Sequence, residues 1–297
     1  MRGDQLIDIE SMRNREQFVP STDGTLEVRV DGVHFSYGAF PILKGIDLVI
    51  DKAELVSIIG PNGVGKSTLI RCMNKILKPT EGAVLVDGTD VSTVTEKSLA
   101  KVMGYVPCSS PGTFPISVVD AVLMGRYPHQ KYGSLEGDLE IVYDTLEKLG
   151  IENLAMRSLN ELSAGQYQKV MVAKGLAQKP RVLLLDEPTA NLDIRHQLNV
   201  THLLRDVSHH DSVTVVMICH DLNIAAKYSD KVVLMHEGRI FAAGTPKEVI
   251  TESNLMTVYG VKSKVVEDMG RPHVMLRDDE DPRWDVWGSS RSPHHGV

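Results

Sequence analysis

The stretch Gly60-Pro61-Asn62-Gly63-Val64-Gly65-Lys66-Ser67-Thr68 fits the phosphate-binding pattern GxxxxGK[ST]. The apolar residues 55–59 before it predict a buried strand, and residues 69–77 after it predict a helix that Pro79 ends. Strand, glycine-rich loop and helix in this order are the context in which such a loop binds phosphate. The stretch therefore predicts an α/β core that binds a nucleotide.

The residue types in this loop suit a charged phosphate chain. The glycines let backbone N–H groups surround phosphate oxygens, and the following helix points its positive N-terminal end at the same charge. Lys66 would reach the β- and γ-phosphates, and the hydroxyl of Ser67 would take a place on Mg²⁺. We expect a nucleoside triphosphate to bind through Gly60, Pro61, Asn62, Gly63, Gly65, Lys66, Ser67 and Thr68.

Composition limits the class of protein. The chain has 297 residues, 42% of them hydrophobic, and a net charge of -7, which argues against a nucleic-acid partner. Cys72, Cys108 and Cys219 lie far apart without metal-type spacing, so we expect free thiols in a reducing compartment. The polar start of the chain, residues 1–20, lacks a signal-peptide core, and no apolar run approaches the roughly 20 residues that span a bilayer. We expect a cytosolic chain, so another chain would have to span any membrane at which it works.

The segments around the phosphate loop predict antiparallel strands. Residues 1–24 are expected to be a flexible tail, and Asp31-Gly32 is expected to form a tight turn between the first two strands. Alternating or apolar runs predict strands at 25–30, 33–38, 46–50 and 82–88.

Further along, proline and glycine mark an insertion after a short strand at 101–106. Helical spacing at 117–125 and 139–149 predicts a helical subdomain over about 109–162, with a buried stripe formed by Leu139, Val142, Leu146 and Leu149. Alternation of helix and strand then resumes at 166–178, 181–185, 194–207 and 213–218, and a terminal hairpin follows at 231–235 and 239–242. The main domain is thus expected over 25–260, and the extension 261–297 is expected to be a short strand followed by disorder.

Three acidic or basic side chains stand where predicted strands end. Asp186 and Glu187 follow the strand at 181–185, and His220 follows the strand at 213–218. Carboxyl ends of neighbouring parallel strands share one edge of a sheet, which is where such folds bind ligands. Asp186 would then bind Mg²⁺, Glu187 would orient or deprotonate water, and His220 would contact the γ-phosphate.

A second anion site is predicted where Leu162-Ser163-Ala164-Gly165-Gln166 opens a helix. One nucleotide needs only one such loop, so two sites in one chain indicate that two chains pair head to tail. Each chain would then close the nucleotide of the other.

These ordered motifs resemble an ATP-binding subunit of an ABC transporter over about residues 26–260. The resemblance implies ATP and Mg²⁺ as cofactors and an α/β fold, with a P-loop NTPase (RecA-like) core, an N-terminal antiparallel β subdomain and an inserted α-helical subdomain. Residues 162–166 are similar to the signature LSGGQ, with Ala164 in place of the first glycine, and Ser163, Gly165 and Gln166 would meet the γ-phosphate of the partner chain's ATP.

The remaining motifs also match this family residue by residue. Asp186 and Glu187 resemble the Walker B aspartate and the catalytic glutamate, and His220 resembles the switch histidine. Asp193 would face the partner. Tyr37 resembles the aromatic residue that stacks on adenine, with Phe35 as the alternative. Lys66 would complete the catalytic set.

Cys108 departs from the family, which has a glutamine here that contacts Mg²⁺ and the attacking water. A thiol is a weaker hydrogen-bond donor and a poorer Mg²⁺ ligand than an amide. Three interpretations follow: the contact is lost and hydrolysis slows, Ser109 or Ser110 supplies the oxygen, or Cys108 is redox-sensitive. The last is disfavoured because nothing near it in the sequence is basic enough to favour a thiolate.

Four segments resemble the ATPases of importers for iron-siderophore chelates, haem and vitamin B12. They are residues 120–126, 191–197, 220–223 and 244–246. That subgroup implies a homodimer at the cytoplasmic face of the membrane, beneath permease subunits. A separate substrate-binding protein would deliver the substrate to the permease. Import of zinc, manganese or molybdate is the nearest alternative. A soluble ABC ATPase would have two ATPase units in one chain or a long coiled-coil insertion, and neither is evident in this sequence. A regulatory paralogue with weak hydrolysis is supported only by Cys108.

Overall fold

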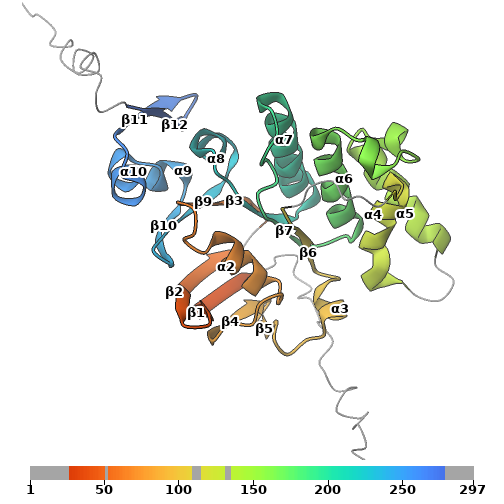
Figure 1. The fold of residues 1–297 in the computed structure, drawn as a ribbon, viewed down its shortest axis with the longest axis horizontal. Coiled ribbons are helices and arrows are strands. Elements are labelled where there is room, and N and C mark those ends of the chain that lie inside the picture. The colour runs from red at the N-terminus through yellow and green to blue at the C-terminus, as the bar shows by residue number, and fades with distance from the viewer. Residues whose placement is uncertain (1–26, 51–52, 109–114, 131–134, 278–297) are drawn as a thin grey trace, which may run out of the picture.

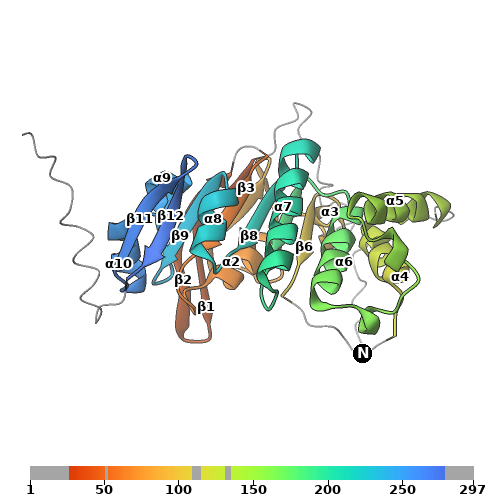
Figure 2. The ribbon, with the colours of Figure 1, turned by 90° about the horizontal axis from the view of Figure 1, so that it is seen from above.

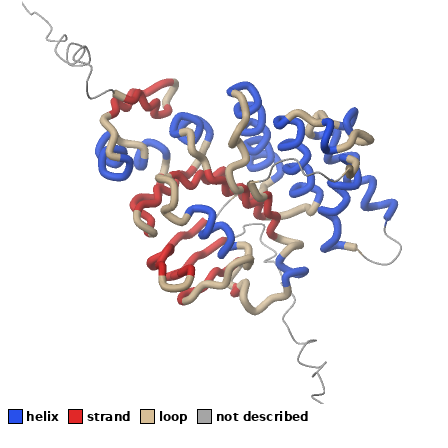
Figure 3. Tube along the Cα trace, viewed as in Figure 1, coloured by secondary structure: helices blue, strands red, loops and turns tan. Residues whose placement is uncertain are grey.

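The computed structural model describes residues 27–50, 53–108, 115–130 and 135–277 (Figure 1). The expected flexible tail 1–24 and the expected disorder near the end of the chain, from residue 278, lie outside the described residues. Figure 2 shows an elongated arrangement, with the helices α4 to α6 at one end and the hairpin β11–β12 at the other. Figure 3 shows that strands dominate the centre of the molecule and helices one end.

The core is a six-stranded sheet in the order β10-β9-β3-β8-β7-β6. Neighbouring strands are parallel except β10, which is antiparallel to β9. Strands β3, β7 and β8 are buried at every position, which explains their continuous apolar sequences. The strands are β3 (Leu55–Ile59), β6 (Met103–Val106), β7 (Val182–Leu185), β8 (Thr214–Ile218), β9 (Lys231–His236) and β10 (Arg239–Gly244).

Helices cover both faces of this sheet. Figure 1 shows α7 (Ile194–Asp211) and α8 (Leu222–Tyr228) on one face and α2 (Lys66–Met73) on the other. The side chains of β7 alternate accordingly: Leu184 packs with the α2 side, while Leu183 and Leu185 pack with α7 and α8. Each of these helices follows a parallel strand of the sheet: α2 follows β3, α7 follows β7 and α8 follows β8. Their first turns therefore lie at the carboxyl edge of the sheet, where the predicted catalytic residues lie.

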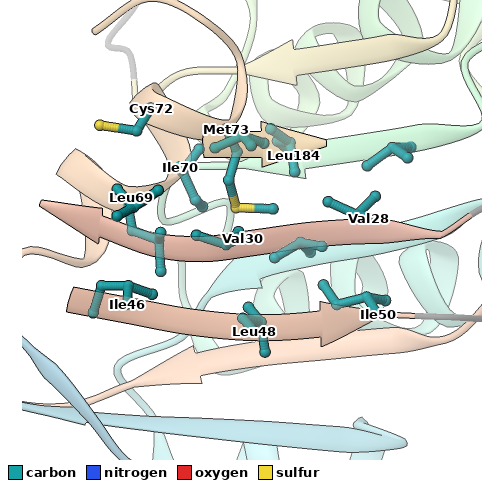
Figure 4. Close-up of a cluster of buried hydrophobic side chains, with 14 of the residues drawn as sticks. Val28, Val30, Ile46, Leu48, Ile50, Leu69, Ile70, Cys72, Met73 and Leu184 are labelled. Atoms are coloured by element: carbon teal, nitrogen blue, oxygen red, sulfur yellow. The ribbon is translucent and has the colours of Figure 1, made fainter. Parts of the chain in front are cut away.

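A second, antiparallel sheet packs under α2 in the order β2-β1-β4-β5. Figure 4 shows Leu69, Ile70 and Met73 of α2 among the side chains of β1 and β2, close to Leu184 of β7. This apolar layer fixes α2, and with it the phosphate loop, between the two sheets. The strands are β1 (Val28–Tyr37), β2 (Phe40–Ile50), β4 (Glu81–Val86) and β5 (Thr89–Asp90).

Two predictions about this region are wrong. Asp31-Gly32 forms no tight turn, because β1 runs through it and its pairing with β2 only shifts register between Val30 and Val33, as in a β-bulge. The helix after the phosphate loop ends at Met73 rather than at residue 77. Lys75 there has a positive φ of 58°, and the N–H groups of Ile76 and Leu77 bond back to the carbonyl of Arg71, which closes the helix.

The inserted segment forms a helical subdomain with its own core. The predicted stripe is confirmed: Val142, Leu146 and Leu149 are buried, and Leu139 packs against them. The short helix α3 (Glu96–Leu99) precedes this segment. The helices of the inserted segment are α4 (Val118–Leu123), η1 (Met124–His129), α5 (Leu135–Lys148), η2 (Glu152–Leu154) and η3 (Leu159–Glu161). Helix α6 (Ala164–Ala177), which follows the segment, packs in the same core.

Gly125→Ala is expected to destabilise this subdomain by about 1–3 kcal/mol. A Cβ at Gly125 would lie 2.1 Å from the carbonyl oxygen of Lys174 in α6, and backbone cannot move aside cheaply. Urea unfolding of the variant measures the loss. Gly137→Ala is the matched control, since Gly137 is a helical glycine with nothing within 4 Å, and alanine there should stabilise by up to about 1 kcal/mol. A Gly125→Ala variant as stable as the control would contradict the close packing.

The hairpin formed by β9 and β10 is not terminal, which corrects the prediction. It is followed by α9 (Pro246–Val249), α10 (Glu252–Tyr259), β11 (Ser263–Asp268) and β12 (Arg271–Leu276). Strand β12 is attached to α8 because the side chain of Asn223 both donates to the carbonyl of Val274 and accepts from its N–H group. Among the described residues, no helix is long and apolar enough to cross a membrane.

Candidate nucleotide site

The phosphate loop joins β3 to α2 with its lysine folded back on the loop. The ammonium of Lys66 donates to the carbonyl oxygens of Gly60 and Pro61, both at 2.8 Å. Gly65 caps α2 in a left-handed conformation with φ of 102°. Burial lowers the pKa of Lys66, while the charges of Glu187 and Asp186 raise it. The loop is thus a curved backbone with the ammonium of Lys66 held against its own carbonyl groups.

Asp186 lies at the end of β7 with only 3% of its surface exposed. Its Oδ1 accepts a 2.7 Å hydrogen bond from the hydroxyl of Ser67, although 119 residues separate the two in sequence. The guanidinium of Arg71 and the hydroxyl of Tyr105 each lie 3.5 Å from its Oδ2. These two neighbours hold one oxygen of the carboxylate and leave the other beside Ser67.

Sequence reasoning missed Arg71 and Tyr105 as partners of Asp186. Arg71 had a visible signal, because it follows Ser67 by four residues and so shares its face of α2. Tyr105 had none, because its place depends on β6 pairing with β7, where it lies opposite Leu184.

Glu187 and His220 meet at the same edge. Nε2 of His220 lies 2.7 Å from Oε1 of Glu187. Glu187 also has a positive φ of 55°, which is uncommon for a residue with a side chain and is found where a structure imposes it. Asp221 caps α8 through the N–H groups of Asn223 and Ile224 and thereby fixes the backbone just after His220.

A cavity of about 580 Å³ opens over these groups. Tyr37 lies on its wall and is 48% exposed, whereas Phe35 is 7% exposed and belongs to the core. The two rings pack edge to face with centroids 4.9 Å apart. Tyr37 is therefore the aromatic ring available to a base. The cavity is lined by Tyr37, Ile42, Asn62, Gly63, Gly65, Lys66, Ser67, Thr68, Glu187 and His220.

The donors at the mouth of the loop fit a magnesium ion. The Ser67 hydroxyl and the buried carboxylate of Asp186 offer hard oxygen ligands side by side, and Mg²⁺ prefers such ligands together with water and phosphate oxygens. When bound, the ion would neutralise charge on the phosphates.

The signature turn lies apart from this cavity. Ser163 caps α6, and its side chain and that of Gln166 form a reciprocal capping box. Gly165 is buried, and Asp193 caps α7 with a side chain that is 68% exposed. Neither the signature residues nor Asp193 line the cavity around Lys66. A single chain thus brings together one part of the predicted site and leaves the other part on a separate surface.

Cys108 is exposed just past β6, and all three cysteines are free. Partial desolvation of the thiol, followed by the charges of Glu187 and Asp186, raises its pKa. A thiolate is therefore disfavoured, which argues against the redox interpretation. Ser109 and Ser110, the alternative oxygen donors, lie outside the described residues.

Cys108→Gln is expected to raise the rate of Mg²⁺-dependent ATP hydrolysis, or at least to leave it unchanged. An amide oxygen is a better ligand and hydrogen-bond acceptor than a thiol for a site that faces Asp186 and Glu187. Steady-state phosphate release at saturating ATP measures the effect. Cys108→Ala serves as the control for removal of the thiol alone. A large loss in the glutamine variant would mean that the thiol itself has a role.

A larger cavity, of about 680 Å³, lies between α7, α8 and the hairpin β11–β12. It contains none of the residues of the phosphate loop. The smaller cavity, in contrast, is lined by Lys66, Glu187 and His220.

The geometry is that of a P-loop nucleoside triphosphatase, in which a phosphate loop faces a carboxylate for the metal and a second carboxylate for water. Comparison with known proteins narrows this class. The family model described as ABC transporter matches residues 43–190. An uncharacterized ABC transporter ATP-binding protein of Methanocaldococcus jannaschii is 44% identical over 246 residues, covering 83% of this chain and 96% of the relative.

Two further relatives agree. The ferric enterobactin transport ATP-binding protein FepC of Escherichia coli K12 is 33% identical, covering 83% of this chain and 92% of the relative. A solved structure of a metal-chelate type ABC transporter in an inward-facing conformation has a TM-score of 0.74 at 27% identity, covering 85% of this chain and 98% of that chain. The chain belongs to the ATP-binding proteins of ABC transporters, and it is an ATPase. Members of this family dimerise and work with transmembrane permease partners.

Proposed function

We propose that this chain powers the import of a metal chelate, of the iron-siderophore, haem or cobalamin type, through a permease. The observation that carries the proposal is the likeness, over most of the chain, to a ferric enterobactin transport protein and to a metal-chelate type transporter. The cargo would not touch this chain, so its residues support the substrate class only through relatives. Zinc, manganese or molybdate import is the alternative.

Within the chain, we assign roles by position in the cavity. Lys66 and the N–H groups of the loop bind the β- and γ-phosphates, and Tyr37 contacts adenine. Ser67 and Asp186 hold the metal. Glu187 orients or deprotonates the attacking water, and His220 lies against Glu187 at 2.7 Å, where it can fix that carboxylate and reach the γ-phosphate.

The separation of the two anion sites supports a head-to-tail homodimer. Ser163, Gly165, Gln166 and Asp193 lie outside the cavity of their own chain, so they are free to close the cavity of a second copy. Closure would pull on the helical subdomain and move the permease beneath which the dimer binds. We place this assembly at the cytoplasmic face of the membrane, with a separate substrate-binding protein that delivers the cargo.

The test is purification of the tagged chain from its native membranes in mild detergent, followed by mass spectrometry. Recovery of a multi-spanning permease would support the importer. Its companion binding protein could then be assayed against an iron chelate, haem and cobalamin, with Zn²⁺, Mn²⁺ and molybdate as comparisons. Recovery without any permease would contradict the proposal, and binding of only the simple ions would favour the alternative cargo.

A further inference from the structure

The two helix N-termini that lie outside the phosphate cavity contact each other through one side chain. Helix α6 starts after Ser163 and helix α7 starts after Asp193. His196, in the first turn of α7, lies against Gly165, in the first turn of α6. A Cβ placed on Gly165 would lie 2.2 Å from Cδ2 and 2.7 Å from Cγ of His196, so the imidazole occupies the space that a side chain would need.

The imidazole is held in this position by Asp193. Oδ1 of Asp193 lies 2.7 Å from Nδ1 of His196 and also accepts the N–H group of His196 at 2.9 Å. Because that oxygen is an acceptor, Nδ1 is the protonated nitrogen of the ring. Nε2 then faces the Gly165 side, where a Cβ would lie 3.0 Å away. The ring is thus fixed at one edge and packed at the other.

We propose that His196 is a positioning residue that joins Asp193 to the signature turn. Displacement of the first turn of α7 would be passed through the ring to Gly165, and hence to the N–H groups of the Ser163–Gln166 turn. On this proposal Gly165 is glycine because the imidazole fills its Cβ position. The competing explanation is that glycine only lets a phosphate approach. The role in hydrolysis rests on the proposed function, whereas the contact itself does not.

A double-mutant cycle on thermal unfolding tests the contact without any activity. The four proteins are wild type, Gly165→Ala, His196→Ala and the double variant. Gly165→Ala should lower the unfolding midpoint in the presence of His196, because the ring must leave Asp193. In the His196→Ala background the same change should raise the midpoint, since alanine favours a helix over glycine. The control Gly137→Ala, which has open space, should shift the midpoint equally in both backgrounds.

Hydrolysis by the assembled transporter tests the positioning role. Gly165→Ala should lose activity, and part of it should return in the double variant. His196→Asn, which keeps an N–H donor near Asp193, should retain more activity than His196→Ala. Binding of a fluorescent ATP analogue to the isolated chain should stay unchanged in His196→Ala and His196→Asn, because His196 is not part of the cavity around Lys66.

The outcomes separate this inference from the proposed function. Equal effects of Gly165→Ala on the midpoint in both backgrounds would overturn the contact. No recovery of activity in the double variant would overturn the positioning role and favour phosphate approach as the reason for glycine. If only the double variant folds and Gly165→Ala does not, the contact is supported; if neither folds, it is refuted. Purification of the wild-type chain without any permease would refute the proposed function and leave the stability cycle interpretable.

Discussion

Glu187→Gln is expected to lower ATP hydrolysis by roughly 100-fold or more, which is the usual contribution of a positioned general base. The amide keeps the shape of the side chain and its contact with His220, which lies 2.7 Å from the carboxylate. It removes the charge that would orient water or accept its proton. ATP binding should persist, because Lys66 and the loop N–H groups are unchanged and the cavity wall carries one negative charge fewer to repel the phosphates.

Phosphate release and binding of a fluorescent ATP analogue separate these two effects. Glu237→Gln is a suitable control: it makes the same chemical change at a 78% exposed carboxylate near, but outside, the cavity around Lys66. The control should keep wild-type activity. Activity of Glu187→Gln close to that of the control would exclude Glu187 as the base, and loss of analogue binding would mean that it mainly shapes the cavity.

The sequence was sufficient to predict that Asp186, Glu187 and His220 lie at one edge of the sheet, although not that Arg71 and Tyr105 contact Asp186. Asp186, Glu187 and His220 follow apolar strands, and parallel strands end at a common edge, so adjacency could be expected before any coordinates. The short distances from Ser67 to Asp186 and from Glu187 to His220 confirm that adjacency. Their chemical roles stay predictions, because proximity alone does not define a reaction.

Local pattern was insufficient where backbone and tertiary contacts compete. Asp31-Gly32 has turn composition, yet β2 and β4 pair on both sides of it and keep the chain extended through a bulge. The apolar residues up to Leu77 have helical spacing, but the chain reverses at Lys75, whose ammonium is bound by the carbonyl of Val94. Such long-range partners cannot be inferred from a window of neighbouring residues.

The contact between His196 and Gly165 shows the same limit inside a known motif. The sequence predicted both helix starts, one at the signature turn and one at residue 194, but not the caps at Ser163 and Asp193. It could not predict that the two starts pack together, because that depends on how the helical subdomain sits beside α7. Glycine in a signature turn therefore has two physical explanations that only the three-dimensional arrangement separates.

Gly60→Ala is expected to destabilise the protein by roughly 2–6 kcal/mol, a large part of the stability of an ordinary domain. Gly60 has a φ of 144°, a conformation that residues with a Cβ avoid. Its Cβ would also lie 2.3 Å from the carbonyl oxygen of Met235 in the neighbouring strand β9. Since the carbonyl of Gly60 holds Lys66 at 2.8 Å, relief of the clash would move the loop and weaken ATP binding as well.

Gly63→Ala separates the effect of the clash with strand β9 from the effect of backbone strain alone. Gly63 lies in the same loop with a φ of 80°, but nothing approaches its Cβ position within 4 Å. Alanine there should cost only about 1–2 kcal/mol for its left-handed conformation. Urea unfolding gives both stabilities, and titration with a fluorescent ATP analogue gives both affinities. Equal losses in the two variants would mean that β9 yields to the new methyl group; a larger loss at Gly60 would mean that the strand beside the loop fixes where the phosphates bind.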